Sequence, residues 1–265
     1  MRRLLLFEFF HADEQAYRGA PDSLQQEGRA MLRALAEDAA SIADVEVTLL
    51  LCASAREFLT SSACVLTSRA SDSLVSQLPE LCAAFDLVLP VAPESEALLQ
   101  QIADAVPDSC VTLLPSLDVV SQCCDKLATY QWLKDCCPML PTQTGTSDQT
   151  SADSIWKPRL GAGCEGIRRT PPVDRFEDWI IQPLLDARSL SVGILGNGHT
   201  HLLLPVAEQH ISWESENPEY LGGEVPAPVS SKVQAQASRI VESLLEQTGA
   251  FRGYLGIDLL VTAGR

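Results

Sequence analysis

The sequence predicts an α/β domain followed by an α+β region, and three observations lead to this fold class. Apolar segments alternate with helical patterns in the first half, as in parallel sheets flanked by helices. A stretch rich in Pro, Thr, Ser, Asp and Gln then interrupts the pattern. In the second half, short strand-like segments surround one long amphipathic helix.

The first half contains four apolar segments that we expect to be strands. They cover residues 2–10, 45–52, 87–91 and 110–114, and helical patterns lie at 73–85 and 94–106. A further helix opens at Pro21, where Ser23 can cap the N-terminus and Gln26 can complete a capping box. Glu8 interrupts the apolar start and no small-residue cleavage site follows. We therefore interpret this start as a buried strand and not as a signal peptide or membrane span.

The second half follows a linker-like stretch that includes Pro138, Pro141 and residues 142–154, and we expect a domain boundary nearby. After it, strands are expected at residues 155–157, 179–182, 189–195, 201–206 and 254–261, with one helix at 232–247. The first half alternates strands and helices, whereas the second half clusters its strands around one helix. This change indicates an α+β region that differs from the first half.

The charge and the cysteines restrict the partners and the compartment. The formal charge is −16, from 35 acidic and 19 basic side chains, so nucleic acid and anionic membranes would be repelled. Local lysines and backbone N–H groups can still bind a small anion. Nine cysteines without a signal peptide indicate a reducing, cytoplasmic environment with free thiols.

Two cysteine pairs and a histidine group are weaker candidates for a metal site. The pairs Cys123-Cys124 and Cys136-Cys137 lack the C-x-x-C spacing, which favours packed thiols over metal ligands. His199, His201 and His210 are close in sequence, and the first two would share one strand face. We expect these histidines to have a structural or surface role.

The most informative segment is a glycine-rich loop that directly follows a predicted strand. Gly161, Gly163 and Gly166 allow a sharp turn that presents N–H groups to anionic oxygens, and Lys157 adds a full positive charge. The Walker pattern is absent, and Pro171 and the residues around it cannot begin the helix that a dinucleotide fingerprint requires. A phosphate loop and a hairpin loop without a ligand are both compatible with this segment alone.

Four motifs in order resemble the ATP-grasp superfamily. They are Cys124-Asp125-Lys126, the run from Lys157 to Ile167, Ile180-Ile181-Gln182-Pro183, and Gly256-Ile257-Asp258. The resemblance implies a pre-ATP-grasp α/β domain at residues 1–122 and an ATP-grasp domain at 123–265, with lobes at about 123–185 and 186–265. Shorter stretches at residues 23–32, 91–96 and 220–223 are similar to archaeal-type tyramine-glutamate ligases of methanofuran biosynthesis.

The resemblance implies roles for individual residues. Those that would bind ATP are Lys126, Lys157, the loop glycines Gly161, Gly163 and Gly166, then Gln182 at the adenine edge and the hinge backbone of Leu184 and Leu185. Asp258 would be a Mg²⁺ ligand at the end of a strand, and Mn²⁺ could replace the ion. We expect Asp258 to be buried, because apolar residues flank it.

Two departures from the family pattern qualify this assignment. Ser189 stands where many members have an acidic residue that binds the ribose. Members also carry further Mg²⁺ ligands on a Glu-x-Asn strand after the aspartate, whereas this sequence stops at Arg265, so we expect an ATP-grasp fold that is incomplete at its C-terminus.

The activity implied by the resemblance is ATP-dependent ligation of a carboxylate to an amine through an acyl phosphate, possible substrates being glutamate and tyramine. This chemistry relies on positioning and charge, and no catalytic side chain is assigned. Small molecules are the expected partners, and a homodimer is possible. The alternative is a non-catalytic nucleotide-binding or interaction module on the same fold.

The cysteine pattern gives a first testable prediction. A thiol-counting reagent should find nearly all nine cysteines reactive under denaturing, non-reducing conditions, because none is expected to form a disulfide. Elemental analysis should find no stoichiometric zinc. One bound zinc ion per chain would contradict the interpretation of the cysteines as packed thiols.

Overall fold

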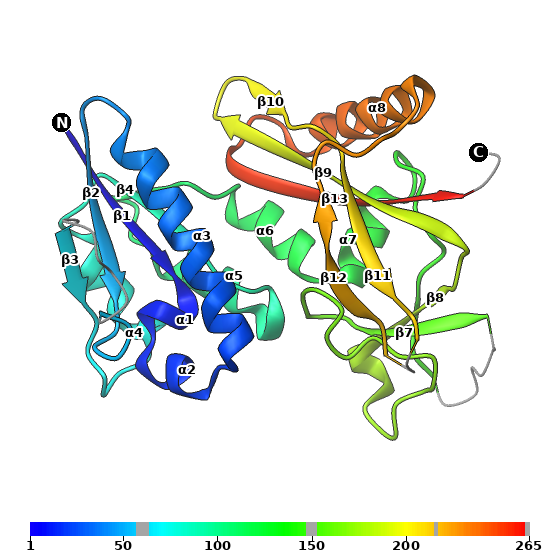
Figure 1. Ribbon diagram of the computed structural model, residues 1–265, viewed down its shortest axis with the longest axis horizontal. Coiled ribbons are helices and arrows are strands. Elements are labelled where there is room, and N and C mark those ends of the chain that lie inside the picture. The colour runs from blue at the N-terminus through cyan, green and yellow to red at the C-terminus, as the bar shows by residue number, and fades with distance from the viewer. Residues whose placement is uncertain (57–63, 147–152, 215–216, 263–265) are drawn as a thin grey trace. The chain divides into compact units, whose positions relative to one another are not determined.

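The computed structural model describes residues 1–56, 64–146, 153–214 and 217–262 (Figure 1). The chain divides into two units. The first consists of Met1–Pro93 and Leu98–Leu117, and the second of Glu94–Ala97 and Asp118–Arg265. The linker-like stretch at residues 138–154 therefore lies inside the second unit, and its residues 147–152 lie outside the described ranges.

A parallel sheet forms the centre of the first unit, as the alternating pattern predicts. Its described strands run in the order β3-β2-β1-β4-β5. They are β1 (Arg2–Glu8), β2 (Val45–Leu51), β3 (Cys64–Thr67), β4 (Leu87–Val91) and β5 (Val111–Thr112). The short β3 was not predicted, because four residues are too few to show a period.

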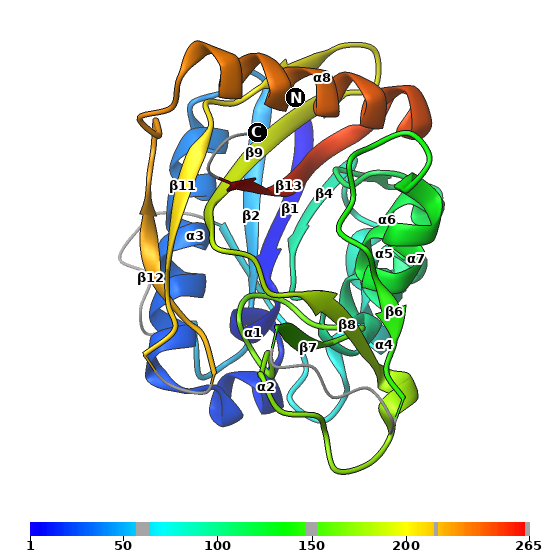
Figure 2. The same ribbon diagram turned by 90° about the vertical axis from the view of Figure 1, so that its right-hand side faces the viewer.

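Helices cover both faces of this sheet (Figures 1 and 2). They are α1 (Phe9–Ala12), α2 (Glu14–Gly19), α3 (Asp22–Ala40), α4 (Leu74–Cys82) and α5 (Leu98–Ala105). On the face covered by α3, Leu32 packs with Leu6 and Leu49. On the other face, Leu78 of α4 and Ile102 of α5 pack with Val88. Each such fully buried side chain contributes roughly 1.5–3 kcal/mol.

Several element boundaries predicted in the first half are wrong: the helix expected from residue 94 begins at Leu98, and the strand expected at 110–114 covers Val111–Thr112. Two other boundaries are wrong for local reasons. The first strand ends at Glu8 and not at Phe10, because the Glu8 carboxylate accepts hydrogen bonds from the N–H groups of Phe10 and His11 and caps α1. Helix α3 begins at Asp22, with Pro21 at the cap position and no side-chain cap bond. Ser23 therefore lies inside the helix and does not cap it.

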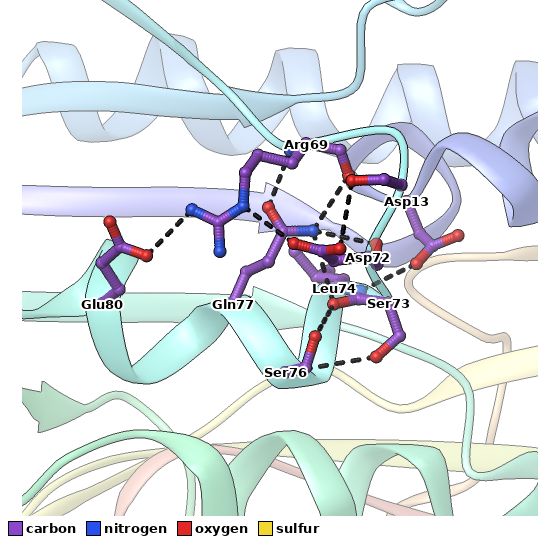
Figure 3. A network of polar contacts seen from close by, with 9 residues as sticks. Asp13, Arg69, Asp72, Ser73, Leu74, Ser76, Gln77 and Glu80 are labelled. Atoms are coloured by element: carbon purple, nitrogen blue, oxygen red, sulfur yellow. Dashed lines mark hydrogen bonds and ion pairs between the residues drawn. The ribbon is translucent and has the colours of Figure 1, made fainter.

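A polar network fixes the connection between β3 and α4 (Figure 3). The side chain of Gln77 is buried. Its Oε1 accepts a hydrogen bond from the Arg69 N–H at 2.7 Å, and its Nε2 donates to the Arg69 carbonyl at 3.0 Å. The Arg69 guanidinium bridges Asp72 and Glu80. Asp13 accepts a 2.9 Å hydrogen bond from the Leu74 N–H at the start of α4. Buried polar groups with their bonds satisfied in this way specify one arrangement of the connection.

The second unit contains two antiparallel sheets among its described residues. In the larger sheet, β9 is the central strand and pairs with β10, β11 and β13, and β12 pairs with β11. Its strands are β9 (Ala187–Asn197), β10 (His201–Leu203), β11 (Ala207–Ser212), β12 (Glu219–Glu224) and β13 (Arg252–Thr262). The smaller sheet has the order β6-β8-β7, from Gln143–Thr144, Trp179–Pro183 and Ser154–Pro158.

Helix α8 (Ser231–Thr248) packs on one face of the larger sheet (Figure 2). Val241 and Leu244 of α8 contact a core that includes Leu190, Val192 and Ile194 of β9. Two further helices, α6 (Leu117–Cys124) and α7 (Lys126–Leu133), precede the smaller sheet. The period of α8 and the alternation in β9 were both readable in the sequence because one face of each element is buried.

Several further expectations are corrected or extended in the second unit. Strands β11 and β12 were not predicted, because their segments are polar and contain a Gly-Gly pair at Gly222. His199 lies in the turn before β10, so it shares no strand face with His201. All nine cysteines lie in the described residues and are free thiols. None of the described helices has the length and apolar character that crossing a bilayer requires.

The packing of Gly28 gives a prediction about the first unit. A Cβ at Gly28 of α3 would lie 2.5 Å from Glu8 Oε2. That carboxylate is buried and fixed by the backbone of α1 and by a 2.6 Å contact to His11 Nδ1. Gly28→Ala should therefore destabilise the protein by about 1–3 kcal/mol. The control is Gly19→Ala, where nothing lies within 4 Å.

Urea denaturation of both variants tests this prediction. The control should be neutral or slightly stabilising, because alanine is the better helix former. A midpoint for Gly28→Ala that equals or exceeds that of the control would show that Glu8 can move aside.

Candidate functional site

The glycine-rich loop connects β7 to a short antiparallel return. Trp156 and Arg168 exchange two backbone hydrogen bonds of 2.8 and 3.0 Å, so residues 159–167 form a closed loop. Gly163 and Gly166 have φ values of +60° and +73°, which residues with a side chain rarely adopt. No helix begins at Arg168 in the described chain, which agrees with the exclusion of a dinucleotide fingerprint.

An ion pair attaches the start of α7 to this loop. Asp125 accepts hydrogen bonds from the N–H groups of Leu127 and Ala128 and forms an ion pair with Arg159. Burial would raise the pKa of Asp125, but these contacts outweigh it and leave the pKa below its usual value. The Lys126 N–H also donates to the Arg159 carbonyl, at 3.1 Å. Lys126 is therefore fixed by the residues on both sides of it.

Lys126 and Lys157 come together beside the loop. Lys126 Nζ donates to the Gly161 carbonyl at 2.6 Å, and both lysine side chains are partly buried. Burial lowers the pKa of each lysine. For Lys126, the negative charge of Glu94 opposes this effect and the positive charge of Lys157 adds to it. Among the described residues, neither ammonium group forms an ion pair. Two neighbouring ammonium groups that form no ion pair within the described ranges provide a site where a polyanion can bind.

Asp258 faces this pair of lysines but differs from the expectation. It lies in the middle of β13 and is exposed, so the predicted buried carboxylate at a strand end is wrong. The alternation of β13 explains this, because Leu255 points to the core and Asp258 to the opposite face. The negative charge of Asp258 raises the pKa of Lys157 against the larger effect of burial. Gln209 Nε2 donates to Asp258 Oδ1 at 3.0 Å.

These residues fit a magnesium ion that is bound together with phosphate. Gln209 donates to Oδ1 of Asp258, and Oδ2 forms no hydrogen bond or ion pair within the part of the chain that the structure describes. The described residues contain no group of three or more His, Cys, Asp or Glu side chains that could hold a metal. Mg²⁺ characteristically keeps several waters and uses one or two carboxylates plus substrate phosphates. The donor set therefore suits a nucleotide-bound ion better than a permanent metal centre.

The hinge residues line a separate pocket of about 590 Å³ in the second unit. The volume is within the range for small-molecule sites. Leu184, Leu185 and Ser189 contribute to its wall, together with Arg169 and Trp213. The Arg169 guanidinium lies 5.1 Å from the Trp213 ring centroid, a cation–π arrangement that the sequence did not indicate.

Gln182 lies just before the hinge on β8, where its Nε2 donates to Thr142 Oγ1 at 2.9 Å. The Leu184 N–H donates to the Asp153 carbonyl at 2.7 Å. The structure thus places the sequence-derived residues in two groups. Lys126, Lys157, the loop and Asp258 form one group, and the hinge with Ser189 forms the other.

Glu94 is a site residue that the sequence reasoning did not find. It belongs to the second unit, and its charge acts on Lys126. Burial raises the pKa of Glu94, Lys126 opposes this effect, and Asp258 adds to it. More than thirty residues separate Glu94 from Lys126, and no spacing rule connects them. Only the folded chain brings this carboxylate near Lys126.

Comparisons with known proteins identify similar folds. A crystal structure of an ATP-grasp superfamily protein from Archaeoglobus fulgidus is similar at 25% identity with a TM-score of 0.76, covering 98% of this chain and 77% of that one. N5-carboxyaminoimidazole ribonucleotide synthetase from Thermotoga maritima matches at 14% identity and a TM-score of 0.62, covering 99% of this chain and 65% of that one.

A third solved structure is the D-Ala:D-Ser ligase VanG from Enterococcus faecalis, with 9% identity and a TM-score of 0.59, covering 98% of this chain and 86% of that one. These low identities show the fold alone. A search of curated protein sequences found no match. A family model described as an ATP-grasp domain matches residues 123–265, which is more than half of the chain. The chain therefore belongs to the ATP-grasp domain family.

Proposed function

We propose that this protein is an ATP-dependent carboxylate–amine ligase that works through an acyl phosphate. The observation that carries the proposal is the pair formed by Lys126 and Lys157 beside the glycine loop, whose ammonium groups form no direct ion pair among the described residues. A triphosphate supplies the missing negative charge. ATP-grasp proteins are ATP-dependent ligases and carboxylases, which agrees with this chemistry.

Each part of the site has a role in this proposal. Lys126 and Lys157 bind the phosphate oxygens, and the loop with Gly161, Gly163 and Gly166 lies over them. The backbone of Leu184 and Leu185 contacts the adenine, with Gln182 at its edge, because these hinge residues lead into the 590 Å³ pocket. The small lobe would span residues 123–185 and the large lobe 186–265.

The proposed reaction has two steps, and both depend on positioning and charge. A substrate carboxylate attacks the γ-phosphorus, the bond from this phosphorus to the oxygen that bridges it to the β-phosphate breaks, and ADP leaves. The lysines stabilise the charge that develops on the phosphate oxygens. An uncharged amine then attacks the acyl carbon, the carbon–oxygen bond to phosphate breaks, phosphate leaves, and the nitrogen loses one proton to water to give the amide. Asp258 and the phosphates would hold Mg²⁺, which would supply additional positive charge to these oxygens.

Glutamate and tyramine are the first substrates to test. Stretches at residues 23–32, 91–96 and 220–223 support this pair, since they are similar to tyramine-glutamate ligases. A non-catalytic nucleotide-binding module is the second candidate. It is favoured by Ser189, which lines the hinge pocket where an acidic residue would bind the ribose hydroxyls.

Replacing Lys157 tests the nucleotide site. Lys157→Ala should weaken ATP binding by about 1.5–3 kcal/mol, because it removes a charge-assisted contact. Calorimetric titration with ATP measures the change. Lys134→Ala is the matched control, since Lys134 is an exposed lysine beyond the end of α7. Equal affinities for the two folded variants would remove Lys157 from the site.

The ligase proposal is tested by substrate-dependent release of phosphate from Mg·ATP. Release should require both glutamate and tyramine, with the amide detected by mass spectrometry. Asp258→Asn should reduce turnover far more than ATP affinity, because the metal acts most strongly on charge that develops in the transition state. Tight ATP binding without ATP consumption for any carboxylate and amine would favour the module instead.

A further inference from the structure

The face of the larger sheet that carries Asp258 has three cross-strand pairs in a row, all in the second unit. They join β9 to β13 and consist of Leu195 with Tyr254, Gly193 with Gly256, and Ser191 with Asp258. The residues that alternate with them, such as Val192 and Leu255, belong to the core under α8. Because side chains alternate along a strand, the three pairs are neighbours on the opposite face.

The ring of Tyr254 lies across the glycine pair. A Cβ at Gly193 would be 2.7 Å from Tyr254 Cε2 and 3.1 Å from its hydroxyl oxygen. A Cβ at Gly256 would be 3.3 Å from the same oxygen. Neither glycine has a positive φ, so the backbone conformation does not require glycine at these positions. The two glycines instead leave the space that the ring occupies, and the ring points along β13 from Tyr254 towards Asp258.

The hydroxyl is the part of Tyr254 that packing does not explain. An aromatic ring that covers glycines stabilises a sheet, and the ring of phenylalanine would serve equally. The hydroxyl forms no hydrogen bond with any residue in the described ranges, and Tyr254 is 55% exposed. Asp258 is two residues beyond Gly256, about 6.6 Å along the strand. A small group bound at Asp258 is therefore within reach of this hydroxyl.

This hydroxyl is a hydrogen-bond donor at neutral pH. Burial raises the pKa of Tyr254, and the negative charge of Asp258 raises it further, so the proton stays on the oxygen. Ser191, opposite Asp258, adds a second hydroxyl on the same face. Hydroxyl donors suit a ligand group that only accepts hydrogen bonds, such as a carboxylate. The Mg²⁺ that Asp258 would hold offsets the repulsion between the two carboxylates.

We propose that Tyr254 is a substrate-binding residue, whose hydroxyl donates a hydrogen bond to the carboxyl group of the carboxylate substrate beside Asp258. This inference rests on the proposed ligase function and names a residue that selects one of its two substrates. The amine substrate is less well suited to this place, because its nitrogen must reach the acyl carbon and not the oxygens that Tyr254 faces.

The experiment uses Tyr254→Phe, which removes the hydroxyl and keeps the ring over the glycines. Calorimetry measures the affinity for glutamate in the presence of Mg²⁺ and a non-hydrolysable ATP analogue. This affinity should fall about tenfold or more, because a hydrogen bond to a charged group is lost. The affinity for the ATP analogue should change less than about twofold, and the midpoint of urea denaturation should stay the same.

Tyr220→Phe is the matched control. Tyr220 lies on the edge strand β12 and is also exposed, and its hydroxyl oxygen would be 3.3 Å from a Cβ at Gly223. This variant should bind glutamate like the unaltered protein.

Turnover with hydroxylamine separates the two substrates. Hydroxylamine displaces phosphate from an acyl phosphate and leaves a hydroxamate. In Tyr254→Phe the KM for glutamate should rise as its affinity falls, whereas the KM for hydroxylamine should change less than about twofold.

Three results would overturn the inference alone. They are an unchanged affinity for glutamate, a rise confined to the KM for hydroxylamine, which assigns the hydroxyl to the nucleophile, and a lowered urea midpoint with an equal loss of nucleotide affinity, which indicates a structural role. If the unaltered protein binds glutamate but consumes no ATP with any nucleophile, the proposed function is wrong, and calorimetry still decides the contact with Tyr254. If neither glutamate nor any other amino acid or dicarboxylate binds, both are wrong.

Discussion

The repulsion between Lys126 and Lys157 is the constraint around which the site is organised. Two partly buried ammonium groups separate unless the backbone and nearby carboxylates oppose their repulsion, which grows as water is removed. The structure holds Lys126 through the Asp125–Arg159 ion pair and through the Gly161 carbonyl. Lys157 is fixed by its place in β7, which pairs with β8. The charged site is therefore assembled before a ligand binds.

The sequence predicted those parts of the fold whose residues are buried on one face. Helix α8 and strand β9 have strong periods because Val241 and Leu190 must point to the same core. Most residues of strands β11 and β12 do not point into a core. Their polar side chains therefore showed no apolar alternation from which a strand could be predicted. Local polar bonds were also unpredictable, as at Glu8, where a cap bond ends a strand that hydropathy alone would extend.

The site residues that are continuous in sequence could be predicted, whereas those that the fold brings together from distant positions could not. The glycine loop with Lys157 was readable because a phosphate loop is continuous in sequence. Asp258 was found by its motif, but its burial was misjudged, since flanking apolar residues on a strand point to the other face. Glu94 and Gln209 could not be found, because each reaches the site through a turn or a strand pairing that no sequence spacing determines.

The pairing of β9 with β13 also fixes how far apart the two ends of the site lie. Asp258 is opposite Ser191, four residues after β9 begins at Ala187, just past the hinge. At about 3.3 Å per residue, this is a span of about 13 Å along the strand. A slip of one residue would shorten or lengthen the span by about 3.3 Å and turn Leu190 out of the core. The hydrophobic core thus sets the length of ligand that can reach from the hinge to Asp258, because it fixes the register of the two strands.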